Sequence, residues 1–142
     1  MVIGVGVNIV EITRIQDTLT QEGDRFLRQT FTINERLYCL AQRTPAPHLA
    51  ARLAAKEAVL KILGIGQCEG FIHTTIDVRT RLSGSPYLVL EGKALEDAQQ
   101  LAISQWQLSL THTHQYAGAF VIAERMGGAT GSVANKSNYK LW

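Results

Sequence analysis

The amino-terminal run "VGVNIVEI" (residues 5–12) constrains the fold more than any other segment. Residues 2–12 are mostly apolar and β-branched, which predicts a strand. Alternation along that strand places its β-branched residues on one face and Gly4, Gly6 and Asn8 on the other. Glycines leave a strand face open to close approach. Two interpretations remain: a helix packs over the glycines while Asn8 satisfies a backbone group, or a ligand approaches beside Asn8.

The other segments predict an α+β fold, in which helices pack against a mainly antiparallel sheet within a single domain. A capping-box pattern, Thr32 followed by Glu35, marks one helix start. Gly23 interrupts an earlier helical segment, and residues 83–86 form a turn. Helices are expected at 14–29, 32–42, 47–63 and 92–103, and strands at 72–80, 87–91, 106–113 and 116–125. Residues 1–125 are expected to form the domain, and residues 126–142, rich in Gly, Ser and Asn, a carboxy-terminal tail.

Composition excludes several classes of protein. A chain of 142 residues with 46% hydrophobic residues is long and apolar enough for one core. Its net charge of +2 is too small to indicate nucleic-acid binding. No apolar run reaches the ~18 residues that span a membrane, and no signal peptide is evident, so a cytoplasmic protein without a membrane partner is expected. Cys39 and Cys68 lack metal-site spacing and are expected to be reduced, packed thiols.

The long predicted helix carries the first candidate site. Ala50, Ala54, Glu57 and Lys61 recur at helical spacing and share one stripe. The simplest interpretation of Glu57 and Lys61 is an exposed ion pair worth ~0.2–0.5 kcal/mol. The alternative is a carboxylate that holds a hard cation beside an ammonium that holds a phosphate.

Two further groups of residues are candidates. The last predicted hairpin carries "SLTHTHQYA", in which Ser109, His112 and Thr113 are either hydrogen-bonded strand-end residues or phosphate ligands. Arginines and one phenylalanine gather before the long helix, either as a solvated face or as a docking surface for an acidic partner; they include Arg14, Arg25, Phe26, Arg28, Arg36 and Arg43. The chain lacks GxSxG, GxGxxG and P-loop motifs, which argues against a hydrolase triad and common nucleotide folds.

Three blocks together resemble the holo-acyl-carrier-protein synthases, the small trimeric class of 4′-phosphopantetheinyl transferases. They are "IGVGVNIVEITRI", "RLAAKEAVLKILGIG" and "SLTHTHQYAGAFVIAE". They stand in family order across residues 1–125, and a turn at Gly84-Ser85-Pro86 is similar to the family's G-[KR]-P turn. The resemblance implies the 4′-phosphopantetheinyl transferase-like fold and a homotrimer whose active site lies between protomers.

The resemblance also implies an activity: transfer of 4′-phosphopantetheine from coenzyme A to a serine of an apo acyl carrier protein, with release of 3′,5′-ADP. Mg²⁺ would bridge the pyrophosphate. It leaves open whether the carrier serves fatty acid or polyketide biosynthesis, and whether Glu57 or water is the general base. By resemblance, Glu57 is a metal ligand and Lys61 a phosphate contact, and both are the expected catalytic residues. The expected coenzyme A contacts are Lys61, Gly84, Pro86, Ser109, His112 and Thr113, and the expected carrier contacts are Arg14, Arg25, Phe26 and Arg28.

Asn8 departs from the family pattern, which has aspartate there as the second metal carboxylate. An amide oxygen still coordinates Mg²⁺, but it is neutral, so metal binding is expected to weaken and one candidate for orienting the serine is lost. Three explanations stay open: an active enzyme with an amide ligand, a weakened paralogue that binds coenzyme A and the carrier, or a deliberate replacement that traps a complex.

Overall fold

The computed structural model describes residues 1–66 and 71–127 of the chain. It is an α+β single domain, as predicted, with two antiparallel sheets of strand order β1-β5-β4 and β2-β3. The elements in chain order are β1 (Val2–Glu11), α1 (Ile12–Glu22), α2 (Asp24–Thr30), α3 (Ile33–Leu40), α4 (Pro45–Leu63), the 3₁₀ turn η1 (Ile72–Thr75), β2 (Ile76–Thr80), β3 (Pro86–Leu90), α5 (Gly92–Gln100), β4 (Gln105–His112) and β5 (Tyr116–Glu124).

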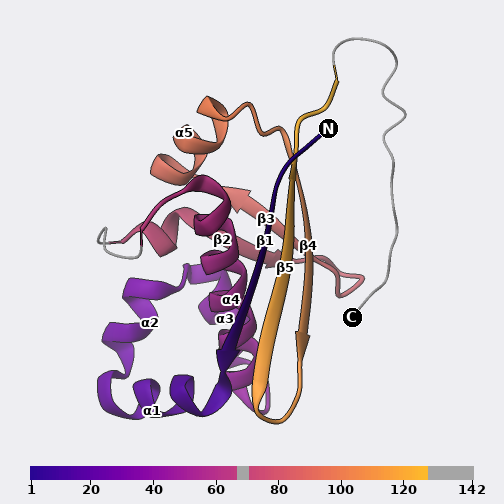
Figure 1. Cartoon of the computed structure of the whole chain (residues 1–142). Coiled ribbons are helices and arrows are strands. Elements are labelled where there is room, and N and C mark those ends of the chain that lie inside the picture. Colours follow the sequence, from indigo (N-terminus) through magenta and orange to yellow (C-terminus); the bar gives the residue numbers. More distant parts are fainter. Residues whose placement is uncertain (67–70, 128–142) are drawn as a thin grey trace.

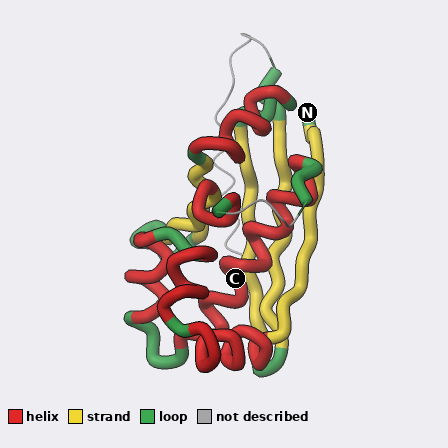
Figure 2. Tube along the Cα trace, turned by 90° about the vertical axis from the view of Figure 1, so that its left-hand side faces the viewer, coloured by secondary structure: helices red, strands yellow, loops and turns green. Residues whose placement is uncertain are grey.

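The helices lie on one side of the three long strands, and α4 crosses the inner face of that sheet (Figures 1 and 2). Two clusters of buried side chains flank α4 and form the core. None of the helices and strands in the described ranges covers the outer face of the sheet, and Val5, Val7 and Ile9 are each at least half exposed on it. None of the helices in the described ranges is long and apolar enough to cross a membrane.

Helix α4 packs directly over the two glycines of β1. A Cβ atom added at Gly6 would lie 2.4 Å from the carbonyl oxygen of Ala58, and one added at Gly4 would lie 2.9 Å from the Ile62 side chain. Both distances are shorter than van der Waals contact. The glycines therefore serve helix packing, as in the first of the two interpretations. That interpretation is wrong for Asn8, which binds the Glu57 and Lys61 side chains of α4 and not a backbone group of the described residues.

Local sequence signals predicted the positions of most helices and strands. The Thr32–Glu35 capping box is present at α3, and Gly23 (φ 54°) separates α1 from α2. Helix α4 starts two residues earlier than predicted, with proline in its first turn, and ends at Gly64 in the left-handed conformation.

The strand predicted at 72–80 and the helix predicted at 92–103 are both shorter in the structure. Residues 72–75 form a 3₁₀ turn instead of the start of a strand, because the Thr74 and Thr75 hydroxyls donate back to the carbonyls of Phe71 and Ile72. Helix α5 ends at Gln100 and not at residue 103, and Ala102 has a positive φ of 57°.

A buried ion pair fixes how α4 is rotated about its axis. Lys56 donates to the Glu35 carboxylate at 2.6 Å and to the carbonyls of His73 and Ile76. Glu35 also accepts the backbone N–H of Val78. Both side chains are fully buried, so removal of either partner would leave an uncompensated charge in the core. Because Lys56 is held toward β2, its neighbour Glu57 is directed toward β1.

Candidate functional site

Asn8 joins Glu57 and Lys61 into one cluster at the edge of the sheet. Its side-chain N–H donates to the Glu57 carboxylate. Its Oδ1 accepts from Lys61 Nζ at 2.9 Å, and Lys61 also donates to the carbonyl of Val7 at 3.0 Å. Glu57 is half-buried and Lys61 is exposed. The predicted stripe of α4 therefore meets Asn8, whose amide stands between the two charged groups.

The chemistry of this cluster fits a weak cation site. Mg²⁺ is commonly held by one or two carboxylates together with substrate phosphates and water, and Glu57 supplies one such carboxylate. The amide oxygen of Asn8 would become a second ligand only after the amide turned over, because Nδ2 now faces Glu57. Within residues 1–66 and 71–127, no group of three or more His, Cys, Asp or Glu side chains forms a ready metal site.

A cleft of about 130 Å³ lies beside the other long-strand edge, where α3, α4, β4 and the 84–86 turn meet. It brings together three predicted contacts, Gly84, Pro86 and His112. Gly84 has a φ of 93°, a conformation that favours glycine. The cleft is lined by Tyr38, His48, Ala51, Arg52, Gly84, Pro86, Leu110, Thr111 and His112.

Arg52 is the buried cation of this cleft. It is only 4% exposed, donates to the His48 carbonyl and to Thr80, and lies with its guanidinium carbon 4.5 Å from the centroid of the Tyr38 ring. Its Nε–H is buried and has no hydrogen-bond partner within the described part of the chain. A buried cation with a spare donor favours an anionic ligand.

Two imidazoles face each other across the cleft. The ring centroids of His48 and His112 are 5.9 Å apart, and the Tyr38 ring lies 6.1 Å from His48. Burial, then the charge of Arg52 and the neighbouring His112, hold the pKa of His48 below its ordinary value. His48 is therefore largely uncharged at neutral pH in the free protein.

The sequence did not single out Tyr38, His48 or Arg52 as site residues. Arg52 opens the block "RLAAKEAVLKILGIG", and His48 precedes it by one helical turn, so both share a face of α4. That spacing was the available signal. Tyr38 comes from α3, and nothing local in the sequence links it to this face.

Ser109 and Thr113, also predicted coenzyme A contacts, are placed differently from His112. Ser109 pairs with Phe120, which directs it to the outer face of the sheet. The Thr113 hydroxyl accepts the backbone N–H groups of Gln115 and Tyr116 and closes the hairpin turn. Neither residue is among those that line the cleft in this single chain.

The predicted carrier contacts lie on α1 and α2. Arg14, Arg25 and Arg28 are exposed, and Arg28 pairs with Asp24 at 2.5 Å. Phe26 is partly buried and packs edge-on against Phe31, so part of its role is structural.

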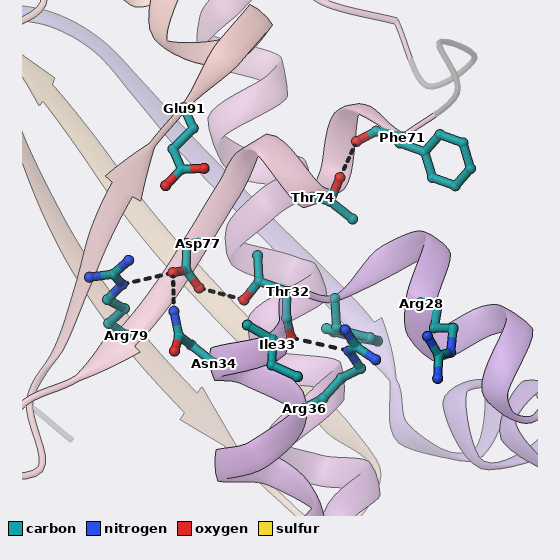
Figure 3. A pocket seen from close by; sticks show the side chains of 11 residues that line it. Arg28, Thr32, Ile33, Asn34, Arg36, Phe71, Thr74, Asp77, Arg79 and Glu91 are labelled. Atoms are coloured by element: carbon teal, nitrogen blue, oxygen red, sulfur yellow. Dashed lines mark hydrogen bonds and ion pairs between the residues drawn. The ribbon is translucent and has the colours of Figure 1, made fainter.

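Arg28 also borders a larger cleft of about 430 Å³ between α2, α3, η1 and β2. Figure 3 shows Arg36 and Arg79 around the mouth of this cleft, and Phe71 directed outward. Asp77 within it accepts from Thr32, Asn34 and Arg79. Its carboxylate is thus already satisfied by protein donors.

Comparison with protein families gives the context of the Asn8–Glu57–Lys61 cluster and of the cleft beside Arg52. Residues 4–121 match the family described as the 4′-phosphopantetheinyl transferase superfamily. The chain belongs to this superfamily. It is 40% identical over 122 residues to the holo-[acyl-carrier-protein] synthase of Protochlamydia amoebophila, a match that covers 86% of this chain and 98% of that protein.

Solved structures of superfamily members have the same fold. The crystal structure of holo-[acyl-carrier-protein] synthase from Neisseria meningitidis matches with a TM-score of 0.77 and 31% identity, over 88% of this chain and all of that one. A synthase from Bacillus anthracis, in complex with coenzyme A (3′,5′-ADP), matches with a TM-score of 0.70 and 28% identity, over 89% of this chain and 99% of that one. The resemblance of the three sequence blocks is therefore confirmed at the level of family and fold.

Proposed function

We propose that the chain transfers 4′-phosphopantetheine from coenzyme A to a serine of an apo acyl carrier protein, with Mg²⁺ as cofactor. Membership of the superfamily is the main support, and similarity to synthases along nearly their full length adds to it. The observation that carries the proposal within this chain is the pair of sites on α4: a carboxylate–ammonium cluster, and a cleft with a buried cation that has a spare donor.

In the proposed reaction, the serine hydroxyl attacks the phosphorus that bears pantetheine. The bond from that phosphorus to the 3′,5′-ADP oxygen breaks, and 3′,5′-ADP leaves with the electron pair. Lys61 neutralises a non-bridging phosphate oxygen, and Glu57 would hold the cation. Mg²⁺ bound there would offset charge on the pyrophosphate oxygens, which is the main demand of phosphoryl transfer. Glu57 and water are the two available acceptors for the serine proton.

Within one chain, the two sites lie on opposite sides of α4 and at opposite edges of the long-stranded sheet. His48 and Glu57 are nine residues apart on α4, which places them about 180° apart around the helix axis. Asn8 is on edge strand β1 and His112 on the opposite edge strand β4. The 130 Å³ cleft also holds only a fragment of coenzyme A, since whole ligand sites are typically ~300–1,000 Å³.

This placement on opposite edges, together with the small volume of the cleft, supports a homotrimer in which the cleft of one protomer meets the cluster of the next. Contacts between two different edges are head-to-tail, and they form a closed ring when the rotation from one subunit to the next closes. The exposed apolar residues on the outer sheet face, Val5, Val7, Ile9 and Phe120, would be covered in such a ring. Mixing tests this arrangement. Glu57→Gln and Arg52→Ala are each expected to be inactive. When the two variants are mixed and their protomers exchange, some interfaces combine an intact cleft with an intact cluster, so part of the wild-type rate should return.

Carrier docking is proposed for the arginine face of α1 and α2. Arg14, Arg25 and Arg28 present positive charge that suits the acidic surface of a carrier, and such charge accelerates and selects encounters. Phe26 contributes the adjoining apolar surface.

The decisive experiment incubates the protein with coenzyme A, Mg²⁺ and an apo carrier protein, and measures the carrier by mass spectrometry. The expected result is addition of one phosphopantetheine, lost in the Glu57→Gln variant. No addition to fatty-acid or polyketide carriers at any Mg²⁺ concentration would refute transferase activity.

The Asn8 hydrogen bond favours a second candidate function, a binder of coenzyme A and the carrier without efficient transfer. Glu57 is already satisfied by the Asn8 amide and competes less well for a cation. The Asn8→Asp variant separates the two functions. A large gain in transfer rate indicates an enzyme limited by its metal site, whereas ligand binding without transfer in both proteins indicates a binding role.

A further inference from the structure

The cleft on the β4 side contains one more ionisable group than anion binding by Arg52 and His112 requires. His48 projects from α4 one turn before Arg52 and faces His112 with 5.9 Å between ring centroids. The ionisable residues around it are Tyr38 from α3, Arg52 from α4 and His112 from β4, and the 84–86 turn lines the cleft with Gly84 and Pro86, which carry no charge. None of the described residues that line the cleft is acidic.

We propose that His48 is a second phosphate-binding imidazole, which takes up a proton when the phosphoadenosine end of coenzyme A enters the cleft. This inference rests on the proposed function, because it assigns that end of the substrate to this cleft. It deepens the function by making nucleotide affinity depend on pH through a specific residue.

The electrostatics of the empty cleft keep His48 uncharged. Burial disfavours the imidazolium, and the nearby Arg52 guanidinium and His112 imidazole add to that effect, so the pKa of His48 is lowered. A phosphate dianion reverses the balance, because an opposite charge within ~4–6 Å favours the protonated form of histidine.

Arg52 supplies the fixed part of the same site. Its buried Nε–H has no partner within residues 1–66 and 71–127, and Tyr38 and Thr80 hold its guanidinium in place. A phosphate that reaches Arg52 therefore lies in the cleft where His48 and His112 face each other. Protonated His48 then donates an N⁺–H hydrogen bond to a phosphate oxygen. Charge-assisted hydrogen bonds of this type are stronger than those between neutral groups.

The sign of the pH dependence follows from linkage. If the bound state has the higher His48 pKa, binding takes up a proton and affinity rises as pH falls through the window between the two values. Affinity for 3′,5′-ADP is expected to increase about three- to tenfold from pH 8 to pH 6, within the tenfold-per-pH-unit limit set by one proton.

The test is calorimetric titration of the full-length protein with 3′,5′-ADP at pH 6.5 in two buffers of different ionisation enthalpy. Wild type is expected to take up a fraction of a proton per ligand. His48→Gln should take up much less and show a flatter affinity–pH profile. His114→Gln is the matched control, because His114 is exposed in the β4–β5 turn and does not line the cleft. Circular dichroism checks that each variant is folded.

A second measurement does not depend on the variant. Imidazole NMR resonances of wild type, assigned with His48→Gln, report the His48 pKa with and without 3′,5′-ADP. A rise in the His48 pKa on binding is expected.

Equal proton uptake by wild type and His48→Gln, or an unchanged His48 pKa at saturation, would overturn the inference and leave the proposed transfer intact. Proton uptake through His48 without transfer to any carrier would refute the proposed function alone. Failure of 3′,5′-ADP to bind at any pH would refute this inference and argue against the proposed function.

Discussion

Asn8 donates its side-chain amide to the carboxylate of Glu57, 49 residues away in sequence. The amide oxygen on its other side accepts from Lys61. A single neutral side chain thus lies between the Glu57 carboxylate and the Lys61 ammonium of the proposed site. A carboxylate in its place would keep the bond to Lys61 but would oppose Glu57, and a cation would then be needed between the two acids. The identity of residue 8 therefore decides whether the folded chain requires a metal at this edge.

Replacing Asn8 with aspartate is expected to make stability depend on Mg²⁺. Without metal, two close carboxylates repel by about 1–2 kcal/mol at a partly exposed site. Saturating Mg²⁺ should return about 1–3 kcal/mol, because it binds only the folded state. Thermal unfolding across a Mg²⁺ series measures the effect, and Mn²⁺ titration followed by electron paramagnetic resonance measures affinity directly. The wild type is expected to respond weakly.

Asn34→Asp is the matched control for this prediction. Asn34 also donates to a carboxylate, that of Asp77 at 3.0 Å, but Arg79 lies against the same carboxylate at 2.7 Å. That variant should lose stability with little recovery in Mg²⁺. If Asn8→Asp and wild type show the same Mg²⁺ response, the amide does not limit metal binding at the cluster.

Lys61→Ala is expected to separate activity from stability. Lys61 is exposed, and its bonds to Asn8 and Val7 are worth about 1 kcal/mol or less to folding. Loss of a cation aimed at a reacting phosphate typically costs on the order of 10²-fold or more in rate. Steady-state transfer assays and thermal melts check both parts. Lys93→Ala on α5, which removes a pair with Asp97 outside both proposed sites, should leave the transfer rate unchanged. A Lys61→Ala enzyme with a near-normal rate would remove Lys61 from the reaction.

The sequence was sufficient for features that depend on neighbouring residues. Alternation in β1 singled out Gly4, Gly6 and Asn8, and helical spacing placed Glu57 and Lys61 on one stripe. It could not show that Asn8 joins these two, because that contact depends on how closely α4 approaches β1. The cleft was even harder to predict from the sequence, because Tyr38, His48 and His112 come from three elements that only tertiary packing brings together.

Gly6→Ala is expected to be strongly destabilising. The added methyl group would lie 2.4 Å from the Ala58 carbonyl oxygen, so α4 would have to move away from β1. Overpacking of this kind typically costs about 1–3 kcal/mol, and the displacement should also weaken the Asn8–Glu57 contact. Gly118→Ala on β5 is the matched control, because its nearest neighbours are at ordinary contact distances of 3.5 and 3.6 Å. Urea unfolding of both variants gives the comparison, and equal costs would contradict a specific role for Gly6.

Asp77 is expected to contribute stability that acid removes. Burial alone would raise the pKa of its carboxyl, but hydrogen bonds from Thr32, Arg79 and Asn34 outweigh burial and hold the pKa below its ordinary value of 3.8. A carboxyl with a depressed native pKa stabilises the fold above pH ~4, and this contribution is lost as pH falls through the native pKa.

Asp77→Asn should therefore cost about 2–4 kcal/mol at pH 7, since it weakens several charge-assisted bonds at a buried site. The gap between variant and wild type should narrow below pH 4, as the wild-type carboxylate protonates. Urea unfolding at a series of pH values measures the gap. A difference that stays constant from pH 7 to pH 3 would show that the charge of Asp77 is not what stabilises the fold.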